Sequence, residues 1–218
     1  MKMLAIDTST DYLTLAAMDG EKTLGRFHRK ADRNHSSLLI PMIDQLLKKS
    51  KLRLKDIDIF CVGIGPGSFT GLRIGVATVK GMGYSLNKPV IAVPSLDAVA
   101  RNVKNFCGII CPVLDAKKSK VYACFYRSDK NAFKRVSEYL LLPVKDLMRE
   151  ADRYEKVIFL GDGVGLIGKE ENANIDWHPK ADIIGMIGLE LAAKKRFTTP
   201  QDLEPLYLYS RECDITGQ

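Results

Sequence analysis

The sequence has little of what marks a secreted or membrane-bound protein. Only 8% of its 218 residues are aromatic, with a single tryptophan and three histidines. No apolar run approaches the ~20 residues that a membrane-spanning helix needs. The apolar run before Asp7 is four residues long, which is too short for the core of a signal peptide. We therefore expect a cytoplasmic protein that does not associate with a membrane.

Cysteine is also scarce, and its odd count excludes a fully paired disulfide framework. Most of the cysteines lie in apolar runs such as "IFCVGI", and the five are Cys61, Cys107, Cys111, Cys124 and Cys213. Buried, reduced thiols are therefore the expectation. Cys107 and Cys111 are four residues apart, but no second pair or nearby histidine completes a zinc-ligand pattern. The sequence thus predicts no metal site.

Acidic residues are outnumbered by basic ones, which gives a formal net charge of +7. The basic residues are spread over "LLKKSKLRLK", "DAKKSK" and "AAKKRF" and are not interleaved with aromatic residues. A solvated basic surface explains this distribution, and weak auxiliary contact with RNA is the alternative.

The order of predicted elements is β-β-β-α-β-α, and this order begins again near residue 108. In the first copy the pattern predicts strands at 2–8, 12–19 and 22–29, a helix at 34–50, a strand at 56–65 and a helix at 71–86. In the second copy it predicts strands at 108–116, 120–127 and 135–142, a helix at 143–151, a strand at 156–163 and a helix at 181–196. The chain is therefore expected to form two lobes, residues 1–104 and 105–218.

Two such lobes resemble the α/β plan of the duplicated ribonuclease-H-like fold, with mixed sheets flanked by helices, which actin, sugar kinases and heat-shock ATPases share. Asp7 and Asp115 end the first strand of each copy. In that fold a turn such as Asp7–Thr8–Ser9 presents N–H and hydroxyl groups to a nucleotide phosphate. Asp7, Thr8, Ser9 and Asp115 are therefore candidate nucleotide-binding residues. An ordinary strand-ending turn is the alternative.

The loop "GIGPGSFTG" (63–71) is rich in glycine but lacks the side chains that usually do chemistry. It does not match the phosphate-binding G-x-x-x-x-G-K-[ST] motif, because no Lys-Ser or Lys-Thr follows the glycines. It does not match G-x-G-x-x-G either. Glycines instead remove Cβ atoms where two backbones pass closely.

The helix predicted after this loop is poor in residues that stabilise an isolated helix. Gly71 and Gly75 leave one of its faces flat. Packing against its own sheet is one interpretation, and packing against a helix of another chain is the other. The preceding helix carries a wide apolar stripe that could serve both a sheet and a partner.

Together, "LAIDTST", "HSSLLIPMIDQLL", "VGIGPGSFTGLRIGVATVKGMGYSLNKPVIAVPSLDA", "PVLDAKKSKVYACFY" and "EPLYLYSRE" closely resemble the TsaB (YeaZ) family. The resemblance covers essentially the whole chain, and "GPGSFTGLRIG" is specific to TsaB and its paralogue TsaD. TsaB is the bacterial partner of TsaD in making N6-threonylcarbamoyladenosine (t6A) at position 37 of tRNAs. The resemblance implies an actin-like, glycoprotease-like fold and a non-catalytic subunit that supports the threonylcarbamoyl transfer.

One departure separates this sequence from TsaD. TsaD has a metal-binding H-x-x-x-H pair just after the segment that matches residues 93–102. Here "AVARNVKNF" contains no histidine, and His28, His35 and His178 are far apart in the sequence. The resemblance therefore implies no catalytic residue, no metal and no required cofactor, and it leaves weak ATP or ADP binding open.

The resemblance also implies that the two helices contact TsaD, or a second TsaB when the protein is alone as a homodimer. The implied interface residues are His35, Leu38, Leu39, Met42, Ile43, Leu46, Gly71, Leu72, Gly75, Val76, Val79 and Gly83. The ATPase TsaE would join the assembly, and contact with tRNA would be weak.

Two other functions are open from the residues alone. The first is a free-standing enzyme, either an ATP-dependent kinase-like protein or a peptidase. A peptidase needs an activated nucleophile, and Ser9, Ser68 and Ser119 have no histidine partner that the sequence assigns. The second is a stand-alone RNA-binding module, which rests only on the net charge.

Overall fold

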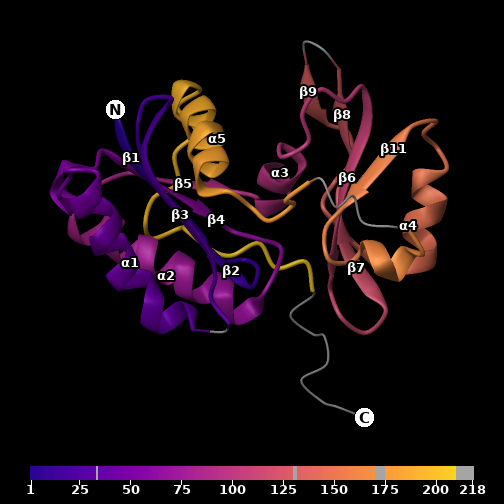
Figure 1. The fold of residues 1–218 in the computed structure, drawn as a ribbon, viewed down its shortest axis with the longest axis horizontal. Helices are drawn as coiled ribbons and strands as arrows, with labels where there is room; N and C mark the ends of the chain where they lie inside the picture. Colours follow the sequence, from indigo (N-terminus) through magenta and orange to yellow (C-terminus); the bar gives the residue numbers. More distant parts are fainter. Residues whose placement is uncertain (33, 130–131, 170–174, 210–218) are drawn as a thin grey trace. The chain divides into compact units, whose positions relative to one another are not determined.

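The computed structural model describes residues 1–32, 34–129, 132–169 and 175–209. The chain divides into two compact units (Figure 1). Unit 1 comprises Met1–Asn102 and Trp177–Pro205, and unit 2 comprises Val103–Asp176 and Leu206–Gln218. Within the described residues, no helix combines the length and apolar character needed to cross a membrane.

Unit 1 is built on a five-stranded mixed sheet with the order β3-β2-β1-β4-β5. The strands are β1 (Lys2–Asp7), β2 (Tyr12–Asp19), β3 (Lys22–Lys30), β4 (Ile59–Gly63) and β5 (Val90–Val93). The first three form an antiparallel meander, while β4 pairs in parallel with both β1 and β5. The predicted meander in the first copy is confirmed.

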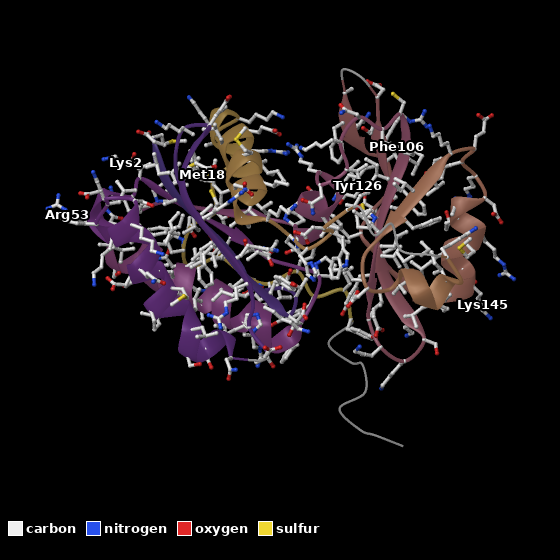
Figure 2. All side chains as sticks on the ribbon, in the orientation of Figure 1. Lys2, Met18, Arg53, Phe106, Tyr126 and Lys145 are labelled. Carbon is white, nitrogen blue, oxygen red and sulfur yellow. The ribbon has the colours of Figure 1, made fainter. Side chains whose placement is uncertain are left out.

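Helices cover both faces of this sheet (Figure 1). They are α1 (His35–Lys49), α2 (Phe69–Ser85), the short α3 (Ser95–Ala100) and α5 (Ala181–Ala193), with a 3₁₀ turn η1 (Leu54–Asp56) after α1. Because side chains alternate along a strand, Leu4 and Ile6 of β1 pack in the core beneath α1 and α2, while Met3 and Ala5 pack beneath α5. Met18 of β2 also lies beside α5 (Figure 2).

The helix α5 belongs to unit 1, whereas the sequence pattern places it in the second lobe. All of residues 105–218 were expected in the second lobe, but 177–205 return to unit 1, where α5 contacts β1, β2, β4 and β5. The reason is packing. Ala181, Ile184 and Ile187 join the core formed by Met3, Ala5 and their neighbours.

Unit 2 repeats the meander in a less regular form, with the strand order β10-β7-β6-β8-β9 and β11 beside β6. Its elements are β6 (Gly108–Asp115), β7 (Lys120–Ala123), β8 (Tyr126–Ser128), β9 (Phe133–Arg135), β10 (Leu140–Pro143), α4 (Val144–Ala151), β11 (Val157–Leu160) and a 3₁₀ turn, η2 (Val164–Ile167). Its own core includes Phe125, Leu147 and Val164.

Two strands that the sequence predicts as continuous are each interrupted. The predicted strand 120–127 forms β7 and β8 in a single register along β6, and the gap lies opposite Pro112, which has no N–H to donate. The predicted strand 135–142 forms β9 and β10. Between them, the Oγ of Ser137 accepts a hydrogen bond from the backbone N–H of Phe125, at 2.9 Å, in place of a ladder bond.

The cysteines follow the prediction with one exception. Cys61, Cys111 and Cys124 are buried and form no disulfide within the described residues, whereas Cys107 is exposed. Burial raises the pKa of Cys61 to about 12. Cys213 lies outside the described residues.

Candidate functional site

The turn after β1 is completely enclosed within unit 1. Asp7 and Thr8 have no exposed surface, and Ser9 is 2% exposed. One carboxylate oxygen of Asp7 accepts hydrogen bonds from the N–H and hydroxyl of Ser9, at 2.8 and 2.7 Å. The other accepts a hydrogen bond from the hydroxyl of Ser95, at 2.7 Å, and this hydroxyl in turn accepts one from the N–H of Gly65. Both carboxylate oxygens of Asp7 are thus hydrogen-bonded by other groups of the same chain.

The glycine loop and α2 close over this turn, and each glycine marks a point of near contact. A Cβ atom on Gly67 would lie 2.2 Å from the carbonyl oxygen of Ser9, and one on Gly71 would lie 2.1 Å from that of Thr8. On Gly75 it would lie 2.3 Å from the Oγ1 of Thr8. All three distances are below those that real Cβ atoms adopt, so glycine is required for this packing.

Specific hydrogen bonds hold the loop in place. The N–H of Ser68 donates to the carbonyl of Ser9 at 2.7 Å, and the hydroxyl of Thr8 donates to the carbonyl of Gly71 at 2.7 Å. The Oγ of Ser68 also accepts from the N–H of Gly71, which caps the start of α2. In unit 1, the loop and the start of α2 therefore pack directly against Thr8 and Ser9, two of the predicted nucleotide-binding residues.

Burial has an electrostatic consequence for Asp7. It raises the pKa of Asp7 above its ordinary value, although hydrogen bonds from Ser95 and Ser9 and the charge of His35 oppose the shift. A metal-binding or general-base carboxylate needs access to its ligand or substrate. In this arrangement Asp7 instead organises the turn.

Asp115 occupies the equivalent position in unit 2, at the end of β6. Its carboxylate accepts a hydrogen bond from the N–H of Lys117 at 2.7 Å, which repeats the bond between Asp7 and Ser9 two residues further along the chain. Its own N–H donates to the carboxylate of Asp162 at 2.9 Å. Burial pushes its pKa upward, but hydrogen bonds from Lys117 outweigh this and hold the pKa below its ordinary value. Unlike Asp7, the Asp115 side chain retains 23% exposure.

The twelve predicted interface residues lie mainly inside unit 1. Leu38 and Met42 are half-buried at the edge of the core. The other ten are buried: His35, Leu39, Ile43, Leu46, Gly71, Leu72, Gly75, Val76, Val79 and Gly83. Their side of α1 and α2 packs against the protein's own sheet, as the simpler interpretation of the glycine-rich helix has it. These ten residues are covered by the chain's own core, and their contact with a partner stays a prediction.

The outward sides of the same two helices carry large apolar side chains that sequence reasoning did not select. Ile40 on α1 is 56% exposed, and Phe69 and Tyr84 on α2 are 53% and 69% exposed. The guanidinium of Arg73 lies 4.0 Å from the centre of the Phe69 ring. We call Ile40, Phe69, Arg73 and Tyr84 the outer helix face. Phe69, Arg73 and Tyr84 recur on the exposed side of α2, and Ile40 lies outside the buried stripe of α1, so the sequence carries this signal once the buried stripes are known.

Unit 1 also brings together two histidines that are distant in the sequence. The ring centroids of His28 and His178 are 6.1 Å apart, and both rings contact Tyr12. The third, His35, is 6% exposed at the start of α1. The register that places His28 near His178 depends on the return of α5 to unit 1, which the sequence did not predict.

The two meanders, each with an aspartate turn after its first strand, define an α/β protein of the ribonuclease-H-like class. The fold is shared with YeaZ from Pseudomonas aeruginosa, at a TM-score of 0.78 and 24% identity over 95% of this chain and 99% of that one. It is shared more distantly with the activator of the 2-hydroxyisocaproyl-CoA dehydratase from Clostridium difficile, at a TM-score of 0.51 and 10% identity, over 95% of this chain and 100% of that one. The predicted fold class is confirmed.

Sequence comparison identifies the family. The family model "TsaD: tRNA N6-adenosine threonylcarbamoyltransferase" matches residues 21–183. The tRNA threonylcarbamoyladenosine biosynthesis protein TsaB of Bacillus subtilis (strain 168) is 33% identical over 100% of this chain and 91% of its own. The protein of the same name from Escherichia coli (strain K12) is 27% identical, over 95% of this chain and 94% of its own. The chain belongs to the TsaB family.

Proposed function

We propose that this protein is a non-catalytic subunit in the synthesis of t6A in tRNA, and that it binds and supports a TsaD chain. The observation that carries the proposal is full-length similarity to proteins named for t6A biosynthesis. The enclosed aspartate turn supports the non-catalytic part. Asp7 and Ser9 hydrogen-bond to each other within the turn, Asp7 also accepts a hydrogen bond from Ser95, and the hydroxyl of Thr8 donates to the carbonyl of Gly71.

We place the contact with TsaD on the outer helix face. The TsaD family model covers residues 21–183, which include both α1 and α2, so a TsaD chain has counterparts of these helices. Two related helix pairs can pack against each other in a pseudo-symmetric arrangement. Exposed Ile40, Phe69 and Tyr84 would lose solvent contact in such an interface, and Arg73 would sit among them, as aromatic residues and arginine often do at interface centres.

The experiment compares two matched substitutions of exposed aliphatic residues. Ile40→Glu places a charge on the outer helix face, whereas Leu166→Glu places one on η2 of unit 2, where Leu166 is 47% exposed. Purified protein is mixed with TsaD and run by size exclusion. We expect Ile40→Glu to separate from TsaD and Leu166→Glu to co-elute with it. Both variants should keep the circular dichroism of the wild type, because neither residue is buried.

The same variants test function. TsaE, TsaD, tRNA and threonylcarbamoyl-adenylate are combined with each one, and t6A is measured by mass spectrometry of digested tRNA. We expect t6A with the wild type and Leu166→Glu, and little with Ile40→Glu. Equal t6A in the complete absence of this protein would refute the supporting role. Co-elution of Ile40→Glu and Tyr84→Glu with TsaD would instead refute the placement of the surface.

A homodimer through the same face is the expected state of the protein alone, since a second copy presents an identical helix pair. Light scattering on the wild type and Ile40→Glu measures it. In this proposal TsaE joins the complex, the reaction takes place in the cytoplasm and tRNA contacts this subunit weakly. Salt-sensitive binding of tRNA without TsaD would support the RNA contact.

Nucleotide binding is a second candidate function. The supporting role in t6A synthesis would not require the nucleotide as a cofactor. The feature that favours it is Asp115, whose turn repeats that of Asp7 but remains partly exposed. Calorimetry with ATP or ADP and magnesium on the isolated protein measures it. Heat of binding that Asp115→Asn abolishes would support a weak site, and steady turnover of ATP would contradict a non-catalytic subunit.

A further inference from the structure

A cluster of aromatic and imidazole rings joins the edge strand of unit 1 to the segment that leads into α5. The Tyr12 ring contacts both imidazoles, with centroid distances of 4.7 Å to His28 and 3.8 Å to His178. Trp177 also stacks on His178, with ring centroids 4.0 Å apart. A ring nitrogen of His28 and one of His178 lie within 4.8 Å of each other.

The fold produces this cluster by strand register and by one hydrogen bond. Thr14 of β2 is directly opposite His28 of β3, and Tyr12 lies two residues before Thr14, so all three point to the same face of the sheet. The hydroxyl of Thr14 accepts the N–H of Ala181 at 3.1 Å. This bond fixes the first residue of α5, and His178 lies three residues before it.

Carboxylates accompany the two imidazoles. The Oδ1 of Asp11 lies 3.6 Å from the Nε2 of His178. Asp176 is separated from His178 by a single residue along the chain. Imidazole nitrogens supported by carboxylates are the donors that zinc and neighbouring divalent transition metals prefer. A carboxylate beside a ligating histidine also orients its ring.

We propose that His28 and His178 form a binding site for a divalent transition metal such as Zn²⁺, and that the ion fastens β3 to the segment before α5. An ion bonded to each nitrogen at about 2.0–2.1 Å requires a nitrogen separation below about 4.2 Å. Binding would therefore draw together two nitrogens that lie within 4.8 Å of each other in this structure. The sequence predicts no metal site because its histidines are far apart along the chain. In the fold, the pairing of β3 with β2 and the return of α5 to unit 1 bring His28 and His178 together.

The rival explanation is that the two imidazoles serve only as stacking partners of Tyr12. Stacking and ligation differ in what they require of the nitrogens, because a glutamine retains a planar polar group but does not replace imidazole as a ligand. The exposed thiol of Cys107 is another place where a metal could attach. The experiment separates these sites.

The test uses the full-length protein without an affinity tag. Calorimetry with ZnCl₂ and visible absorption with Co²⁺ are recorded for the wild type, His28→Gln, His178→Gln and Cys107→Ser. We expect the wild type and Cys107→Ser to bind one ion per chain, and each histidine variant to bind it at least about tenfold more weakly. Zinc should also raise the melting temperature of the wild type and of Cys107→Ser only.

Wild-type affinity in both histidine variants, or its loss in Cys107→Ser, would overturn the proposal. Should either histidine variant fail to fold, the Co²⁺ spectrum of the wild type still tests whether nitrogen and oxygen or thiolate sulfur binds the ion. Nitrogen and oxygen ligation gives weak visible bands alone, and an intense near-ultraviolet band from thiolate ligation would place the ion elsewhere. The test does not involve TsaD, so its result is independent of the proposed function.

Discussion

Two glycines on the same helix should respond in opposite directions to the same substitution. Gly71 and Gly81 both lie within α2, where alanine is favoured over glycine by about 1 kcal/mol through backbone entropy. A Cβ at position 81 meets nothing within 4 Å, so Gly81→Ala should gain most of that amount. A Cβ at position 71 would lie 2.1 Å from the backbone carbonyl oxygen of Thr8.

The contact at Gly71 is with backbone, which cannot rotate away, so α2 or the turn after β1 must shift. Overpacking of this kind typically costs about 1–3 kcal/mol, and a backbone contact belongs at the upper end. The net destabilisation expected for Gly71→Ala is therefore about 2 kcal/mol, since helix propensity returns part of the cost. For a chain of this length, this lowers the melting temperature by about 4–8 °C, whereas Gly81→Ala should raise it by a few degrees.

The assay is thermal and urea unfolding followed by circular dichroism. Gly75→Ala adds a control of a different kind, because its Cβ would meet the Oγ1 of Thr8, 2.3 Å away, rather than backbone. Removal of that oxygen by Thr8→Ala should relieve the clash in Gly75→Ala but not in Gly71→Ala. Equal stabilisation of the protein by Gly71→Ala and Gly81→Ala would refute the close packing of the loop helix on the first turn.

Two further measurements address ionisable groups. Hydrogen bonds from the side chain and backbone of Arg53 lower the pKa of Asp56 to about 2, so its stabilising effect is present above the ordinary value near 3.8 and is lost as pH falls through about 2. Arg53→Gln removes the guanidinium but keeps the backbone hydrogen bond. By NMR at about pH 3, Asp56 should therefore be mainly ionised in the wild type and more protonated in Arg53→Gln, and identical titrations would contradict the pairing. Burial raises the pKa of Cys61 to about 12, whereas Cys107 is exposed. After brief alkylation at mild alkaline pH, mass spectrometry should therefore find Cys107 modified and Cys61 intact. Prompt labelling of Cys61 would contradict its burial.

The first unit was largely predictable because its signals are local. Short runs bounded by polar turns define β1, β2 and β3, and the spacing of Leu39, Ile43 and Leu46 defines α1. Glycine spacing also correctly indicated a close approach of backbones in the loop and α2. It could not identify the partner, because a flat helix face fits its own sheet and a foreign helix equally well.

The second unit was harder to predict because its irregularities depend on distant residues. The break between β7 and β8 arises opposite Pro112, on another strand, and Ser137 bridges the chain where β9 ends. The assignment of α5 to the wrong lobe has a similar origin. The sequence of α5 is apolar on most sides of the helix, so it does not indicate which sheet the helix packs against.

The return of residues 177–205 to unit 1 has a consequence for how the protein is made. Unit 2 is in effect an insertion between two parts of unit 1. While the ribosome is still synthesising residues 103–176, the side of the first sheet that includes Met3 and Ala5 has no α5 to cover it. The amino-terminal part of the chain must therefore wait for the carboxyl-terminal part before its core is complete, and a nascent chain that stops near residue 104 exposes this apolar side to chaperones and to aggregation.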